Sequence, residues 1–155
     1  MSQVFRGALT VLGRLLLCTI FFMAAVGNKI PHFNDVANVM GSVGMPAPQL
    51  MLVGAIVFLI AGSLSIIFGY KARIGAFLLL TFLVLASYYF HPFWKLEGQA
   101  QQEQMIQFMK NLSMMGAMLF IMANGSGPLS LDSRLHERVS ASTEQRRRLT
   151  PANVA

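Results

Sequence analysis

The sequence predicts an all-α integral membrane protein, a four-helix bundle with a short interfacial helix in its first outer loop. Four long apolar stretches fill most of the 155 residues, and about 20 apolar residues are enough to cross a hydrocarbon core as an α-helix. Only 12% of the residues are charged, whereas soluble domains carry about 25%. The apolar runs are continuous rather than alternating, which excludes a β-barrel.

Turn-forming residues separate the four apolar stretches. Pro31 prevents simple continuation of the first helix, and a Gly- and Pro-rich turn at residues 44–48 leads into the second. His91-Pro92 ends the third stretch, and Gly125 with Pro128 stops the fourth. We therefore expect one membrane domain over residues 1–132, with spans at about 7–27, 50–68, 74–90 and 107–123.

The first and third loops each contain a predicted helical segment. Asn34 is a residue type favoured at a helix N-cap, and apolar residues follow it at helical spacing. We expect a short helix over residues 35–40 on the outer membrane surface. The Gln-rich residues 99–107 are expected to begin the fourth helix within the headgroup layer.

Small residues recur every four positions in the second span, at Ala61, Ser65 and Gly69. Such spacing lets two helices approach closely in lipid. We expect this stripe to face another helix.

The basic residues indicate the orientation of the chain and exclude nucleic acid as a partner. The net charge is +6, but Arg6, Lys71, Arg73 and five arginines beyond residue 133 would share one membrane face in a four-span topology. The other face would hold Lys29, Lys95 and Lys110. The positive-inside rule then places both termini in the cytoplasm, and residues 133–155 read as a basic, disordered cytoplasmic tail.

Arg14 is a charged residue about seven positions inside the first span, where a charge is costly. Two interpretations stay open: a snorkelling structural anchor, or a guanidinium inside the bundle that binds an anionic or carbonyl-bearing ligand. No acidic residue lies within a span, so Asp132, just past the fourth span, is the nearest expected partner. Lys29, Lys110 and Asn111 complete the candidate ligand-binding set.

A second polar cluster is expected at the outer face, where three segments end. Its candidates are Asn28, His32 and His91, and two histidines could in principle move protons. However, the sequence has no His/Glu/Cys spacing typical of a metal site, so no metal is predicted. The single cysteine, Cys18, lies inside the first span and reads as a small buried apolar residue.

In the order and spacing of several short motifs, the chain resembles the DoxX family of small four-helix membrane proteins, from about Arg14 to Asp132. The motifs are Gly13-Arg14-Leu15, Lys29-Ile30, Gly44-Met45-Pro46, Gly69-Tyr70-Lys71-Ala72-Arg73, His91-Pro92-Phe93-Trp94, Met109-Lys110-Asn111-Leu112 and Gly127-Pro128-Leu129-Ser130-Leu131-Asp132. Relatives often carry a Glu in the second span, whereas residues 52–55 here have none. The resemblance implies a bacterial inner-membrane location and, for some members, quinone-dependent sulfur oxidation or oxidoreductase complexes that handle redox stress.

Three functional hypotheses follow. The first is an accessory membrane subunit of a redox complex, rather than an enzyme by itself, with a quinone as its cofactor. Such a subunit would contact the lipid bilayer and a soluble or membrane-bound redox partner. The second is a small-molecule transporter or exporter, which with four spans would need a homo-oligomer. The third is a structural or assembly protein without chemistry.

Overall fold

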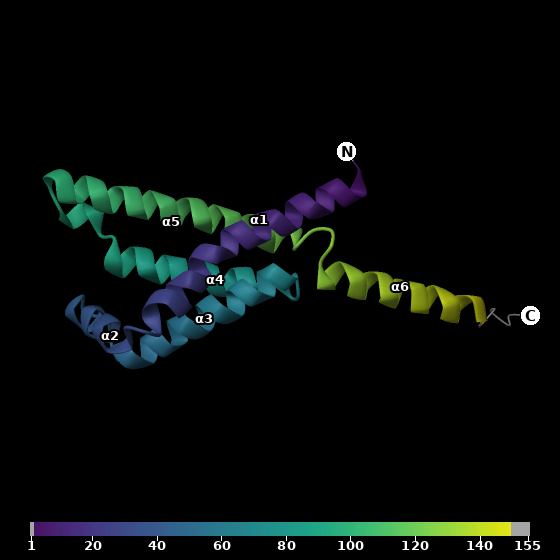
Figure 1. Ribbon diagram of the computed structural model, residues 1–155, viewed down its shortest axis with the longest axis horizontal. Coiled ribbons are helices and arrows are strands. Elements are labelled where there is room, and N and C mark those ends of the chain that lie inside the picture. The colour runs from purple at the N-terminus through teal and green to yellow at the C-terminus, as the bar shows by residue number, and fades with distance from the viewer. Residues whose placement is uncertain (1, 150–155) are drawn as a thin grey trace, which may run out of the picture.

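The computed structural model describes residues 2–149, and these residues contain no β-strand. They form α1 (Gln3–Met23), α2 (Phe33–Ser42), α3 (Pro48–Phe68), α4 (Ala72–Phe90), α5 (Gly98–Asn124) and α6 (Leu131–Leu149), as labelled in Figure 1. A π-helical segment, Ala24–Lys29, continues α1, and a 3₁₀ turn, Phe93–Lys95, follows α4. The all-α fold class is confirmed.

Four helical segments are long and apolar enough to cross a membrane: Gln3–Lys29, Pro48–Phe68, Ala72–Lys95 and Gly98–Asn124. Each contains one predicted span. The last begins nine positions before the predicted span because the Gln-rich segment is already helical, as expected. Large apolar side chains remain exposed along these helices, including Leu16 at 68% and Phe120 at 69%. Lipid explains this exposure, since soluble proteins rarely expose such extensive apolar surface.

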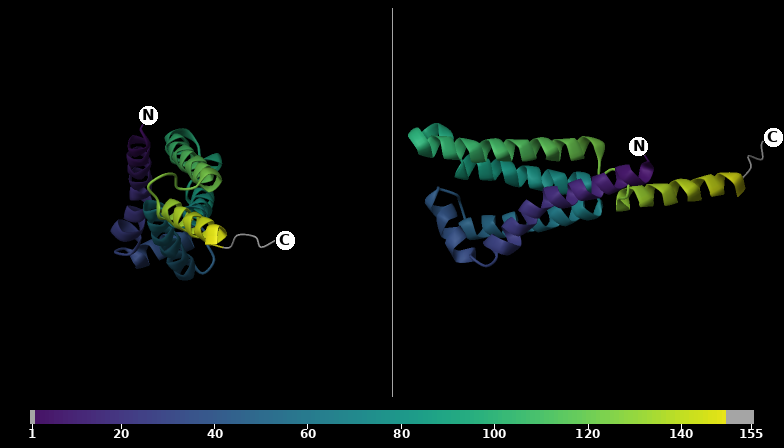
Figure 2. Two further views of the ribbon diagram at one scale, coloured as in Figure 1. Left: turned by 90° about the vertical axis from the view of Figure 1, so that its right-hand side faces the viewer. Right: turned by 45° about the horizontal axis from the view of Figure 1, so that its top comes forward.

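The four long helices pack in the spatial order α1, α3, α4 and α5. Figures 1 and 2 show α1 crossing the bundle obliquely, while α4 and α5 run side by side. The N-terminus and α6 lie at one end of the bundle, called here the termini end, and α2 lies at the opposite end, called the α2 end. The core between them contains the fully buried Cys18, Leu59, Leu79 and Met118.

Two glycines form a close contact between α3 and α4. A Cβ atom on Gly62 would lie 2.9 Å from the carbonyl oxygen of Gly75, so neither position has room for a side chain. Ser65 meets Gly75 of α4, as predicted, but Ala61 is exposed. Gly69 is the C-cap residue after α3 and lies against Arg14 and Ser130 instead of against α4. The small-residue stripe was thus predicted one position out of register at its start. Gly62 meets the neighbouring helix because the buried face of α3 continues through Leu59, Gly62 and Ile66.

The predicted short helix in the first loop is confirmed as α2, although it starts at Phe33, with His32 rather than Asn34 as its N-cap. Its buried residues Ala37 and Met40 pack against Leu52 of α3. This contact gives α2 a fixed position beside the start of α3.

Residues 131–149 form helix α6, where the sequence predicts a disordered tail. The helix starts with reciprocal capping bonds: the backbone N–H of Ser133 donates to Ser130 Oγ at 3.1 Å, and that of Ser130 donates to Ser133 Oγ at 3.2 Å. This is the capping-box arrangement with serine in both roles, and the Arg, Glu, Gln and Ala residues that follow are good helix formers. The disorder predicted for residues 150–155 lies outside the described residues.

Candidate functional site

A cavity of about 980 Å³ lies in the half of the bundle nearer the α2 end. The end of α1, the π-helical segment, α2, α3, α4 and α5 all contribute to its wall. The wall is mainly apolar and includes Phe21, Phe58, Phe82, Phe90 and Met114. A large apolar cavity with a few polar groups is the usual form of a small-molecule site.

Four of the residues singled out in the sequence line this cavity: Asn28, Lys29, His91 and Asn111. Asn111 Nδ2 donates to Ser87 Oγ at 3.0 Å, which joins α5 to α4. His91 Nδ1 lies 2.7 Å from Gln104 Oε1. Because an amide oxygen can only accept, Nδ1 of His91 is the donor in this contact. Asn111 and His91 are therefore each held by a side chain of a neighbouring helix.

The π-helical segment places Asn28 and Lys29 in the cavity wall. In this segment the backbone N–H of Ile30 donates to the carbonyl of Ala25 at 2.9 Å, a bond that spans five residues. π-Helical turns are rare and occur frequently at functional sites. The Lys29 side chain is half-buried, with Nζ 5.4 Å from the centroid of the Phe82 ring.

Three of the other candidates lie outside the cavity. Lys110 and His32 are exposed, and His32 Nδ1 is 4.0 Å from Asp35 on the surface of α2. Arg14 lies in the part of α1 nearer the termini end. The candidate ligand-binding set of the sequence analysis is therefore not one site, because Arg14 and Lys110 do not line the cavity that contains Lys29 and Asn111.

Arg14 points into the bundle, with only 5% of its surface exposed. Its Nη2 donates to the carbonyl of Leu129 at 2.9 Å. Within residues 2–149, Nε and Nη1 have no hydrogen-bond partner. The guanidinium thus ties α1 to the segment that follows α5.

The expected partnership between Arg14 and Asp132 is not formed. The Asp132 carboxylate instead accepts from the backbone N–H groups of Lys71 and Ala72, at 2.9 and 3.3 Å. These groups lie at the positive N-terminal end of α4, where a carboxylate is stabilised. The backbone N–H of Asp132 also donates to the carbonyl of Gly69 at 2.9 Å. The Asp132 carboxylate therefore caps α4 and, contrary to the expectation, does not neutralise Arg14.

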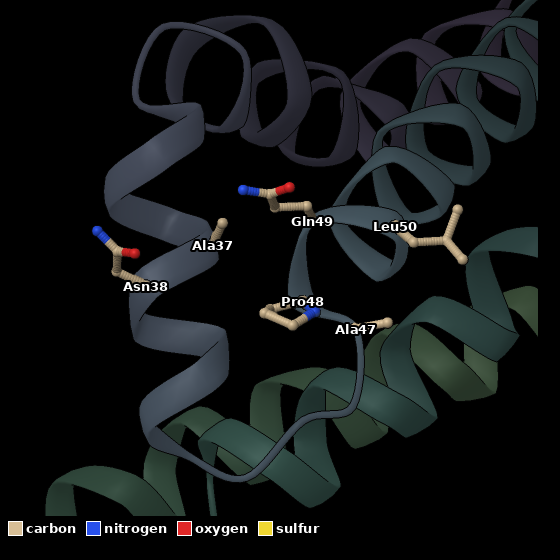
Figure 3. A pocket seen from close by; sticks show the side chains of 6 residues that line it. All are labelled: Ala37, Asn38, Ala47, Pro48, Gln49 and Leu50. Carbon is tan, nitrogen blue, oxygen red and sulfur yellow. The ribbon is translucent and has the colours of Figure 1, made fainter.

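A smaller pocket of about 280 Å³ lies between α2 and the start of α3. Figure 3 shows Gln49 extending from the start of α3 toward α2. Asn38, which lies on α2 like Ala37, points away from Gln49. No charged residue is among those that line it (Ala37, Asn38, Ala47, Pro48, Gln49 and Leu50). This pocket is separate from the polar cluster.

Several residues of the large cavity carried no recognisable signal in the sequence. Phe82 and Gly54 are ordinary residues of apolar spans, and only the fold shows that they face a cavity. Gln104 contacts His91 without lining the cavity; it belongs to the Gln-rich segment, where nothing in the sequence pairs it with His91. Ser87 accepts the hydrogen bond of Asn111 but does not itself line the cavity. Among residues 2–149, no three His, Cys, Asp or Glu residues come together as metal ligands.

Comparisons with known proteins agree with the membrane fold. The DoxX family model matches residues 9–92. Inner membrane protein YphA of Escherichia coli (strain K12) is 30% identical over 129 residues, which cover 83% of this chain and 91% of that protein. Inner membrane protein YqjF of the same organism is 30% identical over 128 residues, covering 83% and 93%. No solved structure matches the chain significantly.

Proposed function

The chain belongs to the DoxX family, with inner-membrane proteins among its relatives, and from this premise we propose that it is the membrane subunit of a redox complex and holds a quinone in its large cavity. The main support for this proposal is the large cavity of the bundle. It is large and mainly apolar, and Asn28, Lys29, His91 and Asn111 are among the residues that contribute its polar groups, with Thr81 and Tyr89.

The residues of the cavity fit the two parts of a quinone. Phe58, Phe82 and Met114 offer apolar surface to a ring and an isoprenoid tail. Lys29 and Asn28 can donate hydrogen bonds to the carbonyl oxygens of a quinone ring. A bound quinone supplies a reversible two-electron carrier that is soluble in the bilayer. In this proposal the electrons come from a partner protein.

Equilibrium binding of a short-chain quinone tests this function. The protein in nanodiscs is expected to bind the compound saturably, at a level stoichiometric with protein, whereas empty nanodiscs only dissolve it in proportion to its concentration. Purely proportional uptake by the protein-loaded discs would contradict the proposal. Net accumulation of the compound inside proteoliposomes would instead support transport.

The orientation of the chain is part of the same proposal. The termini end would face the cytoplasm, since eight Lys and Arg residues flank the spans on that side and three on the other. The cavity would then lie in the outer half of the membrane. A cytoplasmic reporter enzyme fused after Asp132 is expected to be active, and the same reporter inserted near Gln99 inactive. The reverse pattern would overturn the orientation.

A further inference from the structure

Lys29 introduces a positive charge into a cavity whose wall is otherwise mainly apolar. Its ammonium group lies beside the Phe82 ring, 5.4 Å from the centroid, and an aromatic face attracts a cation. A ring does not replace the strong hydrogen bonds that an ammonium group makes with water or a carboxylate. The Lys29 ammonium group can therefore still take a hydrogen-bond acceptor from a bound ligand.

No acidic residue of the chain compensates this charge in the cavity. All six Asp and Glu residues lie within the described part of the chain, and none of them lines the cavity. Asp35 lies beside His32, Glu103 accepts from Gln99, and Asp132 caps α4. Glu97 is exposed in the loop before α5, and Glu137 and Glu144 belong to α6 at the termini end. A counter-charge for Lys29 within the cavity would therefore come from outside the chain.

The backbone that presents Lys29 supports a binding role. Lys29 is the last residue of the π-helical segment Ala24–Lys29. If the α-helix continued through this segment, the Lys29 side chain would point to a different side of the helix. The wider helical turn thus determines that Lys29 and Asn28 both reach the cavity. A lysine serving only as a membrane-surface anchor would not require this geometry.

From these observations we propose that the cavity binds an amphiphile whose polar head carries an oxyanion, with Lys29 as the counter-ion and the apolar body against Phe58 and Phe82. This inference rests on the proposed function and narrows its ligand class to acidic molecules. The oxyanion chemistry is shared by an ionised hydroxyquinone and by an acidic lipid. Asn28 is placed to donate a second hydrogen bond to the same head.

Two matched pairs of compounds test the charge requirement. One pair is a 2-hydroxy-3-alkyl-1,4-naphthoquinone, ionised at neutral pH, and its neutral 2-methoxy ether. The other pair is oleate and oleyl alcohol. Each is titrated into nanodiscs of zwitterionic lipid that contain the full chain, with Lys29→Met as the test variant and Lys95→Met as its control. Lys95 is exposed outside the cavity at the same end of the bundle, so both variants remove the same charge from that face.

The acidic member of the naphthoquinone pair is expected to bind about tenfold more tightly than the neutral ether, a ratio equivalent to about 1.4 kcal/mol. Lys29→Met should remove this preference, whereas Lys95→Met and Lys29→Arg should retain it. The arginine variant also shows that the position tolerates substitution if Lys29→Met fails to fold.

Each alternative outcome has a separate meaning. Equal binding of both naphthoquinones to the wild type would overturn the charge requirement and leave the proposed quinone function standing. A preference for oleate over its alcohol, without binding of either naphthoquinone, would retain the oxyanion site and contradict the quinone function. Failure of all four compounds to bind would overturn both the quinone function and the oxyanion site. A preference for the acidic compound that persists unchanged in Lys29→Met would overturn the oxyanion site alone.

Discussion

The substitution Gly54→Trp is expected to weaken quinone binding by at least about tenfold without destabilising the bundle. Gly54 lies in the N-terminal half of α3 and lines the large cavity. Apart from its own helix backbone and chain neighbours, a Cβ atom there would meet no described atom within 4 Å. A bulky side chain can therefore enter the cavity and occupy the space that the ligand needs. Binding to protein in nanodiscs and the melting temperature in detergent measure the two effects.

Gly116→Trp is the matched control for this variant. Gly116 is an exposed helical glycine of α5 that does not line the cavity, and a Cβ atom there also meets no described atom within 4 Å. It should leave binding unchanged. If Gly54→Trp binds quinone as tightly as Gly116→Trp, the ligand does not occupy this cavity. If Gly54→Trp melts far below Gly116→Trp, the open space assigned to Gly54 is wrong.

The second large effect is expected for Gly69→Ala, which should unfold much more readily than the wild type. Gly69 has φ of +64°, a conformation that costs an L-residue about 1–2 kcal/mol. Its added Cβ would overlap with Arg14 Nη1 and lie 2.5 Å from Ser130 Cβ. Overpacking of this kind typically costs a further 1–3 kcal/mol, roughly. The crowding arises because Arg14, Gly69 and the segment after α5 meet at one point.

Gly44→Ala separates the two contributions. Gly44 has a similar φ of +79°, but a Cβ atom there meets no described atom within 4 Å. Its loss of stability should reflect the backbone conformation alone. We expect the free energy of unfolding in an SDS titration to fall by about 1–3 kcal/mol more for Gly69→Ala than for Gly44→Ala. Equal losses would show that Arg14 and Ser130 move away at no cost.

The membrane helices could be predicted from the sequence because lipid leaves few alternatives. A long apolar segment must satisfy its backbone hydrogen bonds internally, so length and composition locate each span. Contacts between helices are less determined, since every face of a span is apolar. The stripe was accordingly assigned to Ala61, whereas Gly62 makes the contact with α4. Helix α6 was missed because its polar composition hid the local capping bonds between Ser130 and Ser133.

The candidate site was only partly predictable for a related reason. Polar residues inside or next to spans are conspicuous, so Asn28, Lys29, His91 and Asn111 could be identified before the fold was known. The depth of Arg14 was also evident, but its separation from the cavity depends on how α1 crosses the bundle. The apolar cavity wall gave no signal, because Phe82 resembles any other lipid-compatible residue.

Mass spectrometry of the protein purified from its native membrane shows whether the large cavity holds a ligand. A quinone-class molecule, or an acidic amphiphile of the same size range, is expected to co-purify with the wild type and with Gly116→Trp. The same molecule should be lost from Gly54→Trp purified in equal yield. Equal amounts of it in all three proteins, or no such molecule in the wild type, would contradict the assignment of the cavity as the functional site.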